Sequence, residues 1–113
     1  CKPSCGWGMK TNSGKYVQTC DKSDNPLSSS DTKSGCDSGG GAYMCSNQSP
    51  WAVNSTLAYG WAAVKLANSN EQTWCCACYE LTFTSGPVQG QKMIVQASNT
   101  GGDLGSNHFD LAM

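Results

Sequence analysis

The stretch that decides the fold is Trp74-Cys75-Cys76-Ala77-Cys78-Tyr79-Glu80-Leu81-Thr82-Phe83-Thr84. Over residues 76–84 the side chains alternate in character. The apolar set is Ala77, Tyr79, Leu81 and Phe83, and the opposite set is Cys76, Cys78, Glu80 and Thr82. Alternation of this kind is typical of a strand with one buried face, because successive side chains of a strand point to opposite sides. Residues 76–84 are therefore predicted to form a half-buried β-strand.

The segment that follows predicts a turn and a second strand. Gly86-Pro87 and Gly90 are turn residues, and Met93-Ile94-Val95 is a short apolar run of the buried-strand type. Residues 98–107 are rich in Gly, Asn and Ser. They predict a flexible loop that leads into His108-Phe109-Asp110.

The segment that precedes the stretch predicts a helix over residues 54–68. Leu57, Trp61 and Val64 recur at helical spacing, and alanines fill the positions between them. Asn54 or Ser55 suits the N-cap, and Asn68 with Ser69 suits the end of the helix. On such a helix Trp61 would face the core. Residues 1–50 show no sustained period and predict loops and turns held by cysteines, with residues 22–33 as a surface loop.

Length, charge and composition exclude several classes of protein. A chain of 113 residues is expected to form one domain. Its net charge is −1, and no Arg occurs among its seven basic residues, so the chain lacks the basic surface that nucleic acid requires. No apolar run approaches the roughly 20 residues of a membrane span. The first residue is Cys1 rather than Met, as expected of a mature or truncated chain.

Eight cysteines indicate an oxidised, secreted protein. Spacing alone leaves about 105 ways to pair eight cysteines. A structural zinc site is the weaker alternative, because neighbours in a strand point apart and His108 is the only imidazole. Two sequons, at Asn47 and Asn54, are compatible with secretion.

Catalytic chemistry is confined to carboxylates. There is one His and no G-x-S-x-G motif, and Gly39-Gly40-Gly41 lacks the Lys and Ser/Thr of a phosphate-binding loop. Asp103 and Asp110 lie seven residues apart near a strand end. Alternatively, either aspartate could have only a structural role in a turn. This alternative carries more weight for Asp103, which lies among glycines. For Asp110 we expect Phe109 and Leu111 to desolvate the carboxyl and raise its pKa, as an acid catalyst needs.

Trp7 is the second candidate, because it stands between Gly6 and Gly8 in a loop flanked by cysteines. An exposed indole on a rigid loop suits stacking on a sugar ring. The alternative is that Trp7 packs over the disulfides as a small core.

Five blocks of the sequence together resemble glycoside hydrolase family 45, the secreted endo-β-1,4-glucanases. The blocks are residues 1–7 (CKPSCGW), 33–36 (KSGC), 49–54 (SPWAVN), 74–88 (WCCACYELTFTSGPV) and 101–111 (GGDLGSNHFDL). The resemblance runs over the whole chain and in order. It implies a mainly β fold, a six-stranded double-psi β-barrel with long disulfide-linked loops, a short helix and an open substrate groove.

The resemblance also implies that residues 1–113 are part of a catalytic domain. Family members begin earlier, with an Asp before the residue that matches Cys1, and this Asp is the family's general base. They also continue well beyond the position of Met113. An isolated fragment without these parts is expected to be unstable and inactive.

Site residues follow from the resemblance by position. Asp110 resembles the general acid, and Asp103 resembles an auxiliary carboxylate on a mobile loop. Lys2, Trp7 and His108 match residues that line the groove. The implied disulfides are Cys1–Cys36, Cys5–Cys75 and Cys20–Cys45, and Cys76 and Cys78, on one strand face, would pair with cysteines of the missing half.

The implied reaction is hydrolysis of β-1,4-glucosidic bonds inside cellulose or a related β-glucan, with inversion at the anomeric carbon and Asp110 as the acid. No metal or other cofactor is implied. The expected partner is the glucan chain and the expected state is a secreted monomer, with neither nucleic acid nor a membrane involved.

Two other classes compete with the hydrolase. An expansin-like module shares the barrel and the His-Phe-Asp block but loosens or binds polysaccharide without hydrolysis. A barwin-type defence protein would neither cleave glucan nor depend on Asp110. The blocks at 1–7 and 74–79 favour the hydrolase.

Overall fold

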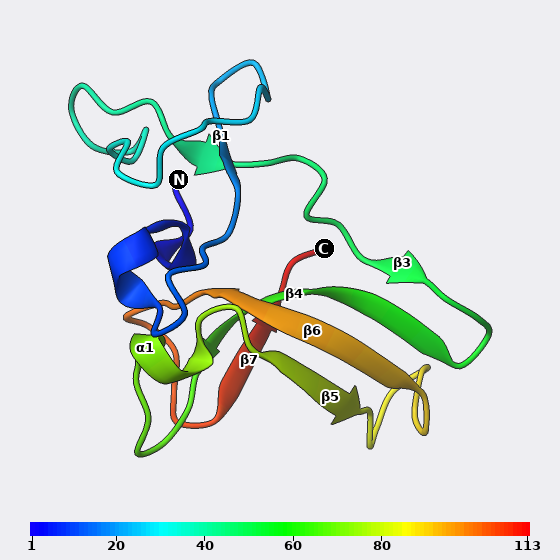
Figure 1. Cartoon of the computed structure of the whole chain (residues 1–113). Helices are drawn as coiled ribbons and strands as arrows, with labels where there is room; N and C mark the ends of the chain where they lie inside the picture. The colour runs from blue at the N-terminus through cyan, green and yellow to red at the C-terminus, as the bar shows by residue number, and fades with distance from the viewer.

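The computed structural model describes all residues, 1–113, and most of its regular structure is β. Figure 1 shows a loop-rich N-terminal part in blue and cyan beside a sheet formed by later strands. In chain order, the elements are the 3-10 helices η1 (Ser4–Gly6) and η2 (Gly8–Lys10), β1 (Thr19–Cys20), β2 (Tyr43–Met44), β3 (Trp51–Ala52), β4 (Leu57–Lys65), α1 (Glu71–Trp74), β5 (Cys78–Thr82), β6 (Lys92–Asn99) and β7 (His108–Leu111).

The main sheet has five strands and is mixed. Its order is β3-β4-β6-β5, and β7 pairs with β4 beyond the end of β3. β4 and β6 are parallel, whereas β3 and β7 run antiparallel to β4 and β5 runs antiparallel to β6. β1 and β2 form a separate two-stranded ladder. β4 is thus the central strand, with β6 on one edge and both β3 and β7 on the other (Figure 1).

The predicted helix at residues 54–68 is wrong, because this segment contains β4. Gly60, Ala62 and Val64 are buried while the residues between them are partly exposed, which is the period of a strand. The small alanines made the apolar pattern compatible with both periods. Pairing with β6 decides in favour of the strand, and Gly60 fits because a Cβ there would lie 2.4 Å from Met93 Cε.

The half-buried strand predicted for residues 76–84 is confirmed over Cys78–Thr82. Tyr79 and Leu81 pack against the core, whereas Cys78, Glu80 and Thr82 are exposed, as predicted. The prediction that Cys76 and Cys78 share one strand face is wrong. Cys76 lies before the strand, with φ at +66°. The glycine turn and the second strand are also confirmed, with φ at +82° for Gly86 and +86° for Gly90, and β6 covers residues 93–95.

Three disulfides hold the N-terminal half, which otherwise has only 3-10 turns and two-residue strands. They are Cys1–Cys36, Cys5–Cys75 and Cys20–Cys45, the same pairs that the resemblance implied. Cys5–Cys75 joins η1 to the end of α1, and the Ser4 backbone N–H donates to Asn99 Oδ1 at the end of β6. The N-terminal part is therefore fixed by a covalent bond to the segment between α1 and β5, and by a hydrogen bond to the end of β6.

The predicted short helix exists only as α1, a single turn over residues 71–74 capped by the Asn70 side chain, which accepts from Thr73 N. The core lies between the sheet and the N-terminal part. It comprises Cys5, Val17, Ala62, Val64, Trp74, Cys75, Met93, Val95 and Ala97. No helix in the structure has the length and apolar character needed to cross a membrane.

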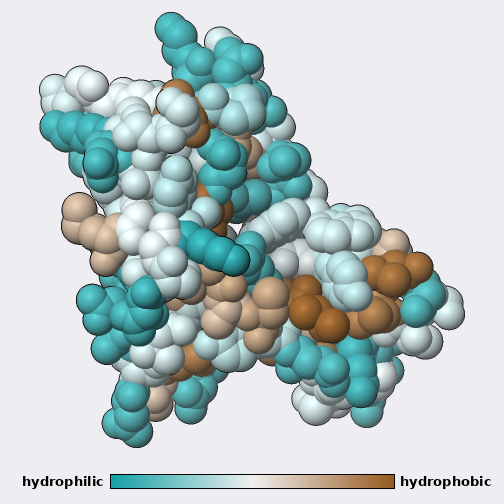
Figure 2. All heavy atoms as spheres, viewed as in Figure 1, coloured by the Kyte–Doolittle hydropathy of each residue, from teal (hydrophilic) through white to brown (hydrophobic).

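A closed six-stranded barrel is not what these residues form. The five strands make an open sheet, since no pairing joins β5 to β7. Figure 2 shows apolar side chains gathered over the sheet, while polar ones predominate over the N-terminal loops. The observed class is a small, mainly β, disulfide-linked domain.

Candidate active site

Asp110 lies on β7, which pairs with β4 along its full length. The predicted flexible loop therefore ends before His108, and the carboxylate is held by a strand rather than by a loop. Asp110 is exposed, whereas Phe109 and Leu111 are partly buried in the core on the opposite face. The expectation that these two neighbours desolvate the carboxyl is wrong, because adjacent residues of a strand point apart. The Asp110 carboxylate makes no hydrogen bond or salt bridge.

Register places Asp110 on the same sheet face as three aromatic side chains. Asp110 pairs with Ala63, and Tyr59 and Trp61 precede Ala63 at intervals of two along β4. Trp61 therefore lies only about 6.5 Å along the strand from the residue opposite Asp110. Trp51 of β3 completes the group, with its ring centroid 5.6 Å from that of Tyr59 and 5.4 Å from that of Trp61.

These three residues, Trp51, Tyr59 and Trp61, form what we call the aromatic row. They line a hollow of about 310 Å³ together with Ile94, Gln96 and Cys78. Trp51 is 49% exposed, so its ring is available for contact. Aromatic rings suit the apolar C–H face of a sugar. Sequence reasoning missed this row, because a helix at residues 54–68 would have turned Trp61 into the core. The alternation of Gly60, Ala62 and Val64 with Tyr59, Trp61 and Ala63 was the signal that could have found it.

Asp103 lies on the loop between β6 and β7, with its carboxylate exposed and unbonded. The adjacent Leu104 is buried, and its backbone N–H donates to Gly101 O, so the loop is anchored beside Asp103. At the end of the loop, Asn107 has φ at +55° and its Oδ1 accepts from Ala67 N. No interaction joins Asp103 to Asp110.

His108 opens β7 and shares the face of Asp110, two residues away. Its Nδ1 accepts a hydrogen bond from Gly105 N at 3.1 Å. An accepting Nδ1 must be unprotonated, so the proton of the neutral ring is on Nε2. The histidine thereby fixes the end of the 100–107 loop against the strand that carries Asp110.

Lys2 and Trp7 lie together in the N-terminal part. Lys2 Nζ is 3.2 Å from the centroid of the Trp7 ring, a cation–π contact. Trp7 is half-buried between η1 and η2, so it is neither a fully exposed platform nor a core residue. The Lys2 side chain is buried, and burial lowers the pKa of its ammonium group, while the charge of Asp31 opposes that shift.

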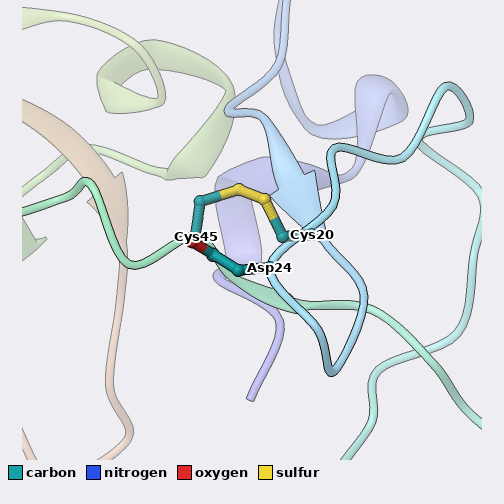
Figure 3. Close-up of side chains that lie close together, drawn as sticks. All are labelled: Cys20, Asp24 and Cys45. Carbon is teal, nitrogen blue, oxygen red and sulfur yellow. A yellow bond between two sulfur atoms is a disulfide. The ribbon is translucent and has the colours of Figure 1, made fainter.

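The one cluster with the spacing of metal ligands is Cys20, Asp24 and Cys45. Figure 3 shows why it is not a thiolate site: a disulfide joins the two cysteines, and Asp24 lies beside it. Asp24 instead accepts hydrogen bonds from the hydroxyl and the backbone N–H of Ser46, and these bonds lower the pKa of its carboxyl. The structure therefore places four of the five predicted site residues in two sets, Asp110 with His108 on β7 and Lys2 with Trp7 near η1. Asp103 stands apart from both sets on the loop between β6 and β7.

An exposed carboxyl group beside a row of aromatic rings is an arrangement compatible with binding and cleaving a polysaccharide. Comparison with known proteins agrees with this class. The family model of glycosyl hydrolase family 45 matches residues 1–113. The chain is 61% identical over 113 residues to a putative endoglucanase type K of Fusarium oxysporum, covering 100% of this chain and 30% of that one. It is 50% identical over 111 residues to an endoglucanase of Cryptopygus antarcticus, covering 98% and 48% respectively.

A solved structure is also similar. The crystal structure of a cellulase from the Antarctic springtail Cryptopygus antarcticus superposes with a TM-score of 0.87 at 48% identity, covering 97% of this chain and 52% of that one. The chain therefore belongs to glycosyl hydrolase family 45. It spans about half the length of the springtail proteins and less than a third of the Fusarium protein.

Proposed function

We propose that the protein containing this chain is a secreted endo-β-1,4-glucanase that cleaves cellulose or a related β-glucan, with Asp110 as the general acid. Membership of the family and the names of its relatives support the reaction class. The observation that carries the role of Asp110 is its place on β7. It is an exposed carboxylate, free of hydrogen bonds and ion pairs, beside the aromatic row.

The chemistry is an inverting displacement. Asp110 donates its proton to the glycosidic oxygen as the bond to the anomeric carbon breaks. Water adds to that carbon from the opposite face and loses a proton to a second carboxylate, which requires the two carboxyl groups to stand roughly 6.5–9.5 Å apart. From the resemblance, that base is an Asp preceding the position of Cys1, and Asp103 is an auxiliary carboxylate on the loop.

We propose further that residues 1–113 form part of a larger catalytic domain. The match to only about half of the springtail cellulase supports this, as does the open sheet. In the larger domain, the sheet closes into a six-stranded double-psi barrel. Cys76 and Cys78, which are unpaired here, bond to cysteines outside these residues, and the domain acts as a monomer without a cofactor.

The test is Asp110→Asn in the protein expressed from the complete reading frame. Loss of a general acid is expected to lower kcat/KM on soluble β-glucan by about 10²–10⁴-fold. Binding to insoluble cellulose, measured by pull-down, should change little because the amide has the shape of the carboxyl.

Asp37→Asn is the matched control, since Asp37 is an exposed carboxylate in a turn of the N-terminal part, and it should leave the rate unchanged. Full activity of Asp110→Asn would refute the assignment of the acid. If the complete protein binds cellulose but hydrolyses no β-glucan, the proposal that it is a glucanase is wrong.

A further inference from the structure

All three N–H donors of the Lys2 ammonium group are used inside the protein. Nζ lies 2.7 Å from Ser30 O and 2.8 Å from Thr32 O, and it stands 3.2 Å above the centroid of the Trp7 ring. Lys2 as a whole is only 7% exposed. An ammonium group has three donors and no acceptor capacity, so none remains for a hydroxyl of a bound sugar.

The rest of Lys2 is fixed as firmly as its charged end. The backbone N–H donates to Ser34 Oγ at 3.2 Å, and the preceding residue is held by the Cys1–Cys36 disulfide. The alkyl chain runs over Gly6, where a Cβ would lie 3.3 Å from Lys2 Cε and 3.5 Å from Lys2 Cγ. The side chain therefore has neither the freedom nor the space to swing out to a ligand.

From this geometry we infer that Lys2 is a positioning residue, which holds the Trp7 ring against the 30–32 loop and affects glucan binding only through that ring. The inference rests on the proposed function, together with the contact between Trp7 and the sugar that the family resemblance implies. An indole held by a cation on one face and by the η1–η2 backbone at its base is already in one rotamer before the ligand arrives. A ring that is ordered beforehand loses less side-chain entropy on binding.

A double-mutant cycle tests this inference in the complete protein. Lys2→Met keeps most of the length of the side chain but removes the charge, and Trp7→Ala removes the ring. Binding of cellohexaose is measured by calorimetry in the Asp110→Asn background, which prevents hydrolysis during the titration. We expect Lys2→Met to weaken binding about threefold to tenfold when Trp7 is present, as loss of a buried cation–π contact would do, and to have no further effect in Trp7→Ala.

Lys33→Met is the matched control. Lys33 also donates its ammonium group to a backbone carbonyl, Ser38 O at 2.8 Å, but its side chain is exposed and faces no ring. It should not change the affinity. Melting temperatures are recorded for every variant. If Lys2→Met does not fold, the bulkier Lys2→Arg gives the same cycle, since any loss from a displaced ring must vanish in Trp7→Ala.

Three outcomes overturn the inference: equal losses from Lys2→Met in both backgrounds, a loss from Lys2→Met when Trp7→Ala alone has none, or no loss from either variant. Each leaves the proposed function standing if the parent protein hydrolyses glucan and Asp110→Asn does not. Failure of the parent to hydrolyse or bind any β-glucan defeats the proposed function instead.

Discussion

Gly6 shows how closely the candidate sugar-binding residues depend on one position of the backbone. It lies in η1, directly before Trp7, and it is buried. A Cβ added there would come 2.7 Å from Thr19 Cγ2 and 3.3 Å from Lys2 Cε. Thr19 is 1% exposed and cannot move aside. The absence of a side chain at residue 6 is therefore what lets Lys2 pass beneath the Trp7 ring.

Gly6→Ala is expected to destabilise the fold by about 1–3 kcal/mol, because overpacking a filled site forces side chains out of their rotamers. Urea denaturation of the complete protein measures this loss. Gly41→Ala is the control, since no atom lies within 4 Å of a Cβ built there. Equal stability of the two variants would contradict the tight packing of Lys2 over Gly6.

At the residue scale, the sequence marked Asp110 as a candidate but did not predict correctly which side chains surround its carboxyl group. A block such as Asn-His-Phe-Asp-Leu marks the residue as a candidate, yet whether Phe109 and Leu111 contact the carboxyl depends on the local backbone. In β7 they point away from it. The fate of the Trp7 ring was likewise undecidable from sequence, because it depends on Lys2, five residues away along a 3-10 turn.

At the scale of elements, the contrast between β4 and β5 shows where a pattern suffices. β5 alternates large apolar with polar residues, so its two faces are plain in the sequence. In β4 alanine occupies both faces, and the larger residues happen to fall at helical spacing. Pairing with β6 selects the strand over the helix for this segment. The two strands are about 35 residues apart in the chain, so this pairing cannot be predicted from local conformational preference.

The β1–β2 ladder depends on carboxylates as well as on its disulfide. Asp21 accepts hydrogen bonds from Ser23 N and Asn25 N, and Asp24 accepts from Ser46. These bonds lower the pKa of both carboxyls below their usual range. A carboxyl whose pKa is lower in the folded state stabilises the fold above its unfolded pKa and loses that contribution as the pH falls through its folded pKa.

We therefore expect Asp24→Asn to melt at a lower temperature than the parent at pH 6, with the difference shrinking below about pH 4. Thermal unfolding between pH 6 and pH 2 provides the comparison. Asp37→Asn serves as control, because the Asp37 carboxylate accepts no hydrogen bond and its loss should leave the curve in place. A difference for Asp24→Asn that persists unchanged at pH 2 would rule out this explanation.

At the scale of the whole molecule, the sheet is open and part of its apolar face is uncovered. Its radius of gyration is 14.6 Å, somewhat above the value of about 13 Å usual for a domain of this length. Only 21 of 113 residues are buried. On the core side of the sheet, an apolar groove of about 540 Å³ lies open between Phe83, Met93 and Leu111. A barrel that closes over this groove is the arrangement we propose for the larger domain.

The disulfide framework could be predicted from the sequence only in part. Cysteine abundance predicted an oxidised framework, but the three pairings came from the resemblance and not from spacing, because loops of irregular length set which sulfurs meet. The strand order and the packing of Trp51 against Tyr59 and Trp61 could not be predicted, since both depend on which strands pair. The alternation along residues 59–64 was a signal only for the strand that carries Tyr59 and Trp61.

The measurement that tests the central claim most directly is the anomeric configuration of the product, followed by proton NMR during hydrolysis of a cello-oligosaccharide by the complete protein. With Asp110 as acid and a separate base activating water, the newly formed reducing end must first appear as the α-anomer and then mutarotate. First appearance of the β-anomer would mean a retaining reaction through a covalent intermediate, and the roles assigned to the carboxylates would be wrong.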